Sequence, residues 1–101
     1  MPHLSDPEFK KEVGERLRRT REALDGKPSQ TRFAKEIGIS KSRLSNYELG
    51  VRMLDLAVAV AICEKYKGVT LDWLYMNDPD RLPAYLTTRL FGLRFETRKK
   101  A

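Results

Sequence analysis

Two short helical patterns separated by a glycine-containing turn constrain this chain more than any other feature of its sequence. Residues 30–37 and residues 41–49 each place apolar side chains at the three- and four-residue spacing of a helix. Ser29 and Ser40 precede the two segments as N-caps, and Gly38 ends the first of them. Because helices of this length are unstable alone, the unit must pack against further helices. The sequence therefore predicts an all-α fold.

Helical patterns on both sides of this unit predict a domain of five helices with an additional C-terminal helix. The first helix should begin near Pro7, after a cap at Ser5 or Asp6, and end near Leu24. The apolar residues 56–63 would suit a buried strand as well as a helix, but the sequence offers no second strand to pair with them. The other expected helices cover residues 56–66, residues 71–76 and a segment opened by Pro83.

The expected domain boundary falls in the polar turn that contains Pro79. Residues 1–78 then form the main domain, in which the helical pair occupies about residues 29–49. Residues 79–101 form a C-terminal helix and a basic tail, and the tail should fray because it has no apolar period.

A surplus of positive charge favours a polyanionic partner. The chain holds 20 lysine and arginine residues against 14 aspartate and glutamate residues, a formal net charge of +6. Such a surface attracts DNA, RNA and anionic membranes alike, so net charge alone does not choose among them. Much of the excess lies between residues 27 and 52, where two acidic residues stand against six basic ones: Lys27, Arg32, Lys35, Lys41, Arg43 and Arg52.

The outer side of the second short helix indicates which polyanion is bound. Residues 41–46 combine lysine, arginine, serine and asparagine around one buried leucine, and none of them is a carboxylate. A helix fits the DNA major groove, where lysine donates to guanine, asparagine pairs with adenine and serine bonds to either. An ordinary helical hairpin with a polar surface is the alternative interpretation. The predicted base-contacting residues are Lys41, Ser42, Ser45 and Asn46.

Phosphate contacts are expected at the ends of the two short helices. Gln30 stands in the first turn of its helix, where free backbone N–H groups suit a phosphate oxygen, and Arg52 follows the other helix. Contacts of this kind orient a protein on DNA without reading its sequence. The predicted phosphate-contacting residues are Gln30, Ser40, Arg43 and Arg52.

Residues 29–50 resemble the helix-turn-helix of Cro and the phage repressors, often called the XRE family. The shared features are a Ser-Gln opening, an alanine at 34, a glycine at 38 and a Glu-x-Gly ending at 48–50. The stretch Val-Thr-Leu-Asp-Trp-Leu at 69–74 is similar to the family's fifth helix, so the resemblance covers about residues 17–75. It implies a lambda-repressor-like DNA-binding domain and a transcriptional regulator, expected to be a repressor, that binds a roughly palindromic operator as a dimer.

The resemblance also implies roles for single residues. It places Lys41, Ser42 and Asn46 against bases and Gln30 against a phosphate, in agreement with the interpretation from residue types. Arg21 and Glu48 match an arginine and a glutamate of the family that suggest an ion pair between the first helix and the recognition helix. The expected role of this pair is structural.

Apolar residues towards the C-terminus are candidates for the contact between two subunits. Three leucines recur there at four-residue spacing, which gives the last helix an apolar side. Packing of that side against the chain's own domain is the alternative. The candidate residues are Trp73, Tyr75, Leu82, Leu86, Leu90 and Phe91.

An antitoxin is the main alternative function. In that case the C-terminal helix would bind a toxin protein while the helix-turn-helix represses the promoter that the pair shares. RNA binding is less well supported, because the sequence shows no exposed aromatic platform of the kind that single-strand readers use.

The sequence argues against an enzyme, a metal site and a cofactor. Its one histidine, His3, has no cluster of cysteine, histidine or carboxylate residues around it, and no glycine-rich phosphate loop is present. Cys63, the single cysteine, is expected to be a buried thiol. No apolar run approaches the roughly 20 residues of a membrane-spanning helix, and the first residues lack the pattern of a signal peptide. We therefore expect a cytoplasmic protein without a membrane partner.

Overall fold

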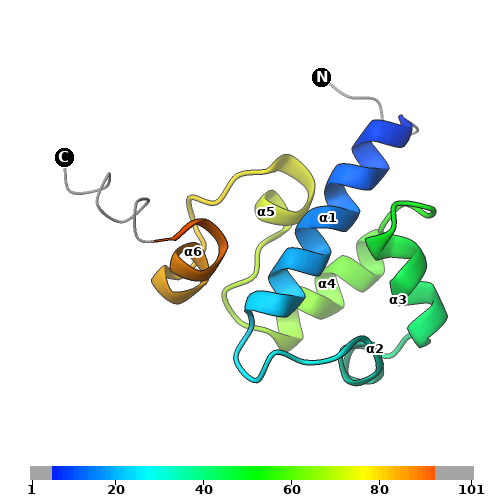
Figure 1. The fold of residues 1–101 in the computed structure, drawn as a ribbon, viewed down its shortest axis with the longest axis horizontal. Helices are drawn as coiled ribbons and strands as arrows, with labels where there is room; N and C mark the ends of the chain where they lie inside the picture. Colours follow the sequence, from blue (N-terminus) through cyan, green and yellow to red (C-terminus); the bar gives the residue numbers. More distant parts are fainter. Residues whose placement is uncertain (1–5, 93–101) are drawn as a thin grey trace.

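The computed structural model describes residues 6–92 and folds them into six helices (Figure 1). The all-α fold expected from the sequence is confirmed, and residues 56–63 belong to a helix rather than a strand. Ser5, His3 and the basic tail at 93–101 lie outside the described residues. The helices are α1 (Pro7–Ala23), α2 (Gln30–Ile37), α3 (Lys41–Glu48), α4 (Leu56–Lys65), α5 (Leu71–Met76) and α6 (Ala84–Phe91).

Side-chain N-caps fix where the first five helices begin. The carboxylate or hydroxyl oxygen of each cap accepts a hydrogen bond from a backbone N–H in the first turn, at distances between 2.8 and 3.3 Å. α6 has no side-chain cap and begins after Pro83. Because these signals are local, the helix ends expected from the sequence agree with the structure to within about one residue. The five caps are Asp6, Ser29, Ser40, Asp55 and Thr70.

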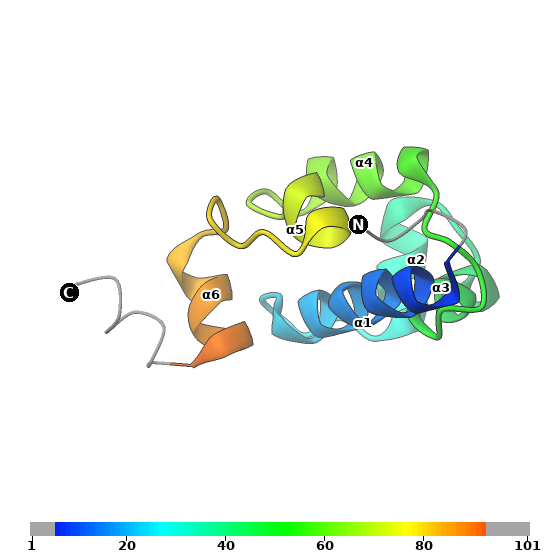
Figure 2. The ribbon, with the colours of Figure 1, turned by 90° about the horizontal axis from the view of Figure 1, so that it is seen from above.

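α1 is the longest helix among the described residues, and it packs against α3, α5 and α6. α2 packs against α3 and α4, and α4 packs against α5. Both views place α3 near one end of the long axis and α6 near the other (Figures 1 and 2). The C-terminal helix is therefore far from the recognition helix expected from the sequence.

The core is one apolar cluster that receives side chains from all six helices. Trp73 is its largest fully buried side chain, and the indole N–H donates to Thr20 Oγ1 at 2.8 Å. Thr20 Oγ1 in turn donates to the carbonyl oxygen of Arg16 at 2.6 Å, so the buried polar groups are satisfied. Cys63 is half-buried at the edge of the cluster, and burial raises the pKa of its thiol.

α6 completes this core, which corrects part of the expected subunit contact. Trp73 and Leu86 are fully buried and Leu82 is 8 % exposed, so these three side chains are covered by their own chain and cannot meet a second copy. The leucine spacing correctly indicated an apolar side, but its partners are inside the domain. Among the other candidates, Tyr75 and Leu90 are half-buried. Phe91 packs edge-on against Trp73 at 5.5 Å between ring centroids but is 38 % exposed.

Arginine side chains hold the C-terminal ends of three helices in place. Arg16 donates to two carbonyl oxygens at the end of α5, at 3.1 and 3.3 Å, and burial lowers the pKa of its guanidinium. Arg19 donates to Leu90 O at the end of α6 at 3.0 Å, and Arg89 donates to Ala23 O at the end of α1 at 2.7 Å. The last carbonyls of a helix have no partner within it, so these bonds both cap the helices and fasten α5 and α6 to α1.

α1 and α3 cross at a very short distance, and Gly14 makes this crossing possible. A Cβ atom at this position would overlap the carbonyl oxygen of Tyr47 and would lie 2.8 Å from the carbonyl oxygen of Glu48. Both obstacles are backbone atoms, which cannot rotate away. The position of α3 against α1 therefore depends on the missing side chain.

We expect Gly14→Ala to lower the free energy of unfolding by about 1 to 3 kcal/mol, because overpacking forces the backbones apart. Helix propensity alone predicts the opposite, a gain of up to about 1 kcal/mol from alanine. Urea denaturation followed by circular dichroism measures the difference. Glu15→Ala, at the exposed neighbouring position, is the control and should change stability by less than about 0.5 kcal/mol. A Gly14→Ala protein as stable as the wild type would contradict this account of the crossing.

Candidate nucleic-acid interface

Helix α3 buries one side and exposes the other. Leu44 and Tyr47 are fully buried, and Glu48 is 6 % exposed. This inner side fixes the helix on the domain, so the outer side of residues 41–46 faces solvent and is not covered by any described part of the chain. On the outer side, Lys41, Ser42 and Asn46 are exposed, while Arg43 and Ser45 are half-buried.

The turn between α2 and α3 sets the angle of α3. Gly38 adopts the left-handed conformation with φ 83°, which a side chain would strain. Its N–H donates to Lys35 O, and the N–H of Ile39 donates to Ala34 O at 3.0 Å, which closes the end of α2. Ser40 then caps α3 at once. The result is a tight turn that presents the first turn of α3 at the surface of the molecule.

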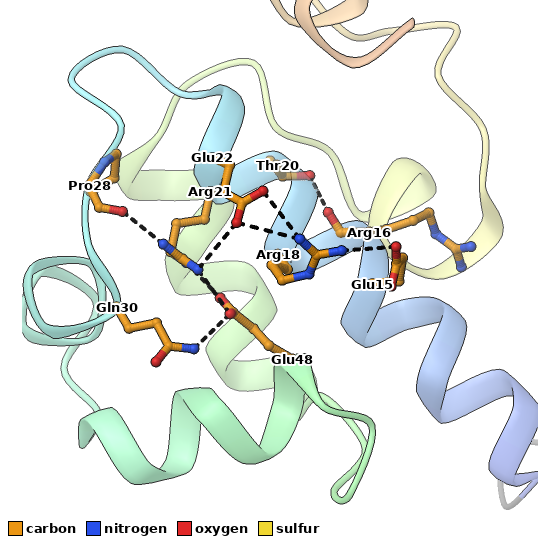
Figure 3. A network of polar contacts seen from close by, with 9 residues as sticks. All are labelled: Glu15, Arg16, Arg18, Thr20, Arg21, Glu22, Pro28, Gln30 and Glu48. Carbon is orange, nitrogen blue, oxygen red and sulfur yellow. Dashed lines mark hydrogen bonds and ion pairs between the residues drawn. The ribbon is translucent and has the colours of Figure 1, made fainter.

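A buried ion pair ties the end of α3 to α1 (Figure 3). Arg21 Nε and Nη2 donate to the two carboxylate oxygens of Glu48, at 2.7 and 3.1 Å, in a bidentate arrangement. The third nitrogen of Arg21 donates to Pro28 O at 3.0 Å. The side chain of Glu48 is 2 % exposed and that of Arg21 is 11 % exposed. The pair that the family resemblance suggested is therefore present, and it also holds the loop before α2.

Gln30 belongs to the same network, which differs from the exposed phosphate contact expected for it. Its side-chain amide Nε2 donates to Glu48 Oε1 at 2.8 Å, and the residue is half-buried (Figure 3). The amide thus faces inward, because a buried carboxylate with several oxygen lone pairs attracts a further donor. In the first turn of α2 the N–H of Arg32 donates to Ser29 Oγ at 3.2 Å, and the N–H groups before it have no partner within the helix.

Arg43 and Arg52 flank the ring of Tyr47 at the other edge of α3. Their guanidinium carbons lie 5.6 and 5.9 Å from the ring centroid. Arg43 also donates to the hydroxyl of Tyr47 at 2.7 Å and to the carboxylate of Asp55 at 3.0 Å. Asp55 therefore offsets part of the charge of Arg43, a contact that the sequence spacing did not indicate. Arg52 is exposed.

Two half-buried tyrosines donate hydrogen bonds that join the helices behind this surface. Tyr66 OH donates to Glu36 Oε1, which joins the end of α4 to α2, while the rings of Tyr66 and Phe33 stack at 5.1 Å. Burial, followed by the bond to Glu36, raises the pKa of Tyr66 to about 12, and the same bond lowers the pKa of the Glu36 carboxyl. Burial also raises the pKa of Tyr75 to about 12, and its hydroxyl donates to Leu54 O. Both hydroxyls therefore keep their protons, and remain donors, to a higher pH than an ordinary tyrosine.

A groove of about 340 Å³ lies beside the contact between α1 and α3, next to the ion-pair network. Ser45 lines it together with residues that sequence reasoning did not assign to the interface. Leu49 stands four residues after Ser45 and lies on the same side of the helix, a spacing from which its place could have been found. The lining residues are Lys11, Glu15, Arg18, Arg21, Gln30, Ser45, Glu48 and Leu49.

The geometry is that of a helix-turn-helix DNA-binding protein, in which a short helix and a tight turn present a second, polar helix at the surface. The chain matches the helix-turn-helix family HTH_3 over residues 17–74, and it belongs to this family. It is therefore a DNA-binding transcriptional regulator of the XRE type, with an all-helical, lambda-repressor-like fold. No curated protein and no solved structure matched the chain.

Domains of this family regulate through DNA and are not typically catalytic. Among residues 6–92, no three histidine, cysteine or carboxylate side chains come together as metal ligands would. The described helices also include none that combines the length and the apolar character needed to cross a membrane.

Removal of one partner from the buried ion pair should destabilise the domain strongly. We expect Glu48→Ala to lower the free energy of unfolding by about 3 to 5 kcal/mol, because it leaves the buried guanidinium of Arg21 with only the half-exposed carboxylate of Glu22, 4.0 Å away, as a counter-charge. Glu15→Ala is the matched control, since Glu15 pairs with Arg18 at 3.0 Å at the surface, where both side chains are about half exposed. A surface pair contributes about 0 to 1 kcal/mol. Similar losses for the two variants, measured by denaturant unfolding, would show that the Arg21 pair is not a structural tie.

Proposed function

We propose that this regulator binds an operator of defined sequence through the outer side of α3 and represses transcription by occupying it. The observation that carries the proposal is that α3 is buried on one side and exposed on the other. Its inner side is fixed by Leu44, Tyr47 and Glu48, and its outer side offers donors and acceptors without a carboxylate. A rigid helix of this kind can enter the major groove without a conformational change.

Base contacts are assigned to the exposed side chains of the first two turns of α3. Asn46 can pair with the N6 and N7 groups of adenine, and Lys41 can donate to the O6 and N7 acceptors of guanine. Ser42 is exposed and Ser45 is half-buried beside the groove, so both can add a hydrogen bond to a base edge. A well-formed bidentate contact discriminates against a wrong base by about 1 to 3 kcal/mol. Asn46 is therefore the most informative of these four residues.

Phosphate contacts are assigned around the edge of the same helix. Ser40 Oγ accepts from the N–H of Arg43 at 3.0 Å, and its hydroxyl proton stays available for a phosphate oxygen. Arg52 is exposed, and its guanidinium lies over the ring of Tyr47. The positive charge of Arg43 is partly offset by the carboxylate of Asp55. At Gln30 the side-chain amide is bonded to Glu48, so the first backbone N–H groups of α2 are the proposed donors there.

A dimer on a roughly palindromic site is the proposed binding form. We place its contact on α4 and α5, because three of the six residues expected for it, Trp73, Leu82 and Leu86, are buried. The hydroxyl of Tyr75 donates to Leu54 O at 2.8 Å, which brings the end of α5 to the start of α4. Exposed apolar side chains lie on these two helices, which leaves a surface for a second copy. Two α3 helices related by symmetry would then enter successive major grooves about 34 to 36 Å apart. The exposed residues are Leu56, Val60, Leu71 and Met76.

The antitoxin alternative would use the C-terminal helix to hold a toxin. Leu82 and Leu86 are already covered by the chain's own core, which leaves the half-buried Leu90 and the exposed Phe91 as the apolar residues of α6 for this use.

Substitutions in α3 should separate base contacts from phosphate contacts. With an operator selected from random duplexes, we expect Lys41→Ala and Asn46→Ala to reduce the ratio of operator affinity to random-DNA affinity by about tenfold or more. Arg52→Ala should weaken binding to both DNAs and flatten the logarithmic salt dependence by about 0.9 for a lost phosphate contact. Fluorescence anisotropy at several salt concentrations measures both quantities.

Arg81→Ala is the control for these DNA-binding measurements, because it removes the same charge from an exposed residue between α5 and α6. Its affinity should stay close to that of the wild type. Equal losses on operator and random DNA for Lys41→Ala, Asn46→Ala and Arg52→Ala would contradict the base assignments.

The double variant Leu56→Ser and Met76→Ser should remove the dimer. We expect the wild type to bind the operator with the mass of two chains and the double variant with the mass of one, as light scattering after gel filtration would show. Val51→Ser, which changes an equally exposed apolar residue outside α4 and α5, should keep the dimer. A dimer that survives in the double variant would place the contact elsewhere.

A further inference from the structure

The most exposed apolar side chains in the described part of the chain stand directly after α3. Leu49 is 67 % exposed and Val51 is 65 % exposed. Burial of a leucine side chain is favourable, and the isolated domain gains little of that free energy here. An apolar group left in water beside a polar binding surface is therefore a candidate contact for that surface's partner.

Leu49 continues the outer side of α3. Its N–H donates to Ser45 O at 2.9 Å and its backbone has helical angles, φ −82° and ψ −7°, so it forms the last helical position. Lys41, Ser45 and Leu49 are spaced by four residues and lie in one row along the helix. Ser45 and Leu49 also line the same groove. The side chain thus points in the direction assigned to the base-contacting residues.

The backbone around Leu49 is held firmly, so its exposure is not a matter of a loose loop. The N–H groups of Val51 and Arg52 both donate to Asn46 O, at 3.0 and 3.2 Å. Gly50 packs against α1, where an added Cβ would lie 2.7 Å from the Cα of Lys11. Leu49 is therefore presented in a fixed position before any partner arrives.

The charges near Leu49 favour DNA over a second copy of the chain as its partner. Lys11 lines the same groove, where the one exposed carboxylate, that of Glu15, is paired with Arg18. Lys41 begins the same row, and Arg52 follows in the chain. A second copy would bring the same cations together, whereas a duplex brings phosphates. The apolar group that the major groove offers is the C5-methyl group of thymine.

We propose that Leu49 contacts the methyl group of a thymine in the operator half-site and is a specificity-determining residue. This proposal rests on the proposed function, because it requires α3 to lie in the major groove. Leu49 then adds an apolar element to a row whose other members read hydrogen-bonding groups.

Single replacement of each operator thymine by deoxyuridine tests the proposal, since it removes one methyl group and leaves base pairing intact. At one or two positions, we expect deoxyuridine to weaken binding of the wild type by about fourfold, the value of one buried methyl group. The same replacements should leave the affinity of Leu49→Ala unchanged. Val51→Ala is the control and should keep the wild-type sensitivity. Because Leu49 is exposed, both variants should unfold at the wild-type temperature.

Three outcomes would overturn the assignment of Leu49. They are an operator without thymine in its half-sites, a wild type insensitive to every deoxyuridine, and equal sensitivity in the wild type and Leu49→Ala. Loss of the dimer mass in Leu49→Ala without a methyl effect would assign Leu49 to the subunit contact instead. In all these cases selective binding to the operator remains, so the proposed function stands. A protein that selects no operator at all would overturn the proposed function itself.

Discussion

The contact between α1 and α3 is the constraint on which the rest of the structure depends. Glu48 is almost completely buried at the end of α3, and a carboxylate in such a place is tolerated only with its charge and lone pairs satisfied. Arg21 and Gln30 satisfy it, and Gly14 allows the backbone of α3 to approach α1 closely enough for these bonds. Because this side of α3 is fixed, its polar side can face only outward.

Local signals explain why the sequence indicated most of the fold. A serine, threonine or aspartate before an apolar pattern both starts a helix and satisfies a backbone N–H, so the helix starts do not depend on distant contacts. Gly38 is a similar case, because its positive φ is set by the end of α2 itself. The outer side of α3 followed from the same periodicity, since Leu44 and Tyr47 had to be buried together.

Contacts between distant parts of the chain were the ones that sequence patterns could not supply. The leucine spacing of α6 indicated an apolar side but not the surface that covers it, which turned out to be its own core. The direction of the Gln30 amide depends on Glu48, and the charge of Arg43 depends on Asp55. These pairings follow from the packing of helices, which no single segment encodes.

The packing of the helices also uses part of the chain's positive charge within the domain. Arg16, Arg19 and Arg89 donate to carbonyl groups at helix ends, so their charges stabilise the domain at places away from α3. A guanidinium is suited to this work because it keeps its charge and offers several donors in a fixed plane. The formal net charge of +6 therefore overstates the positive charge that is available to attract DNA. The strength of that attraction, and its response to salt, must come from the few cations that border α3, and the sequence total cannot distinguish these from the arginines that hold helices together.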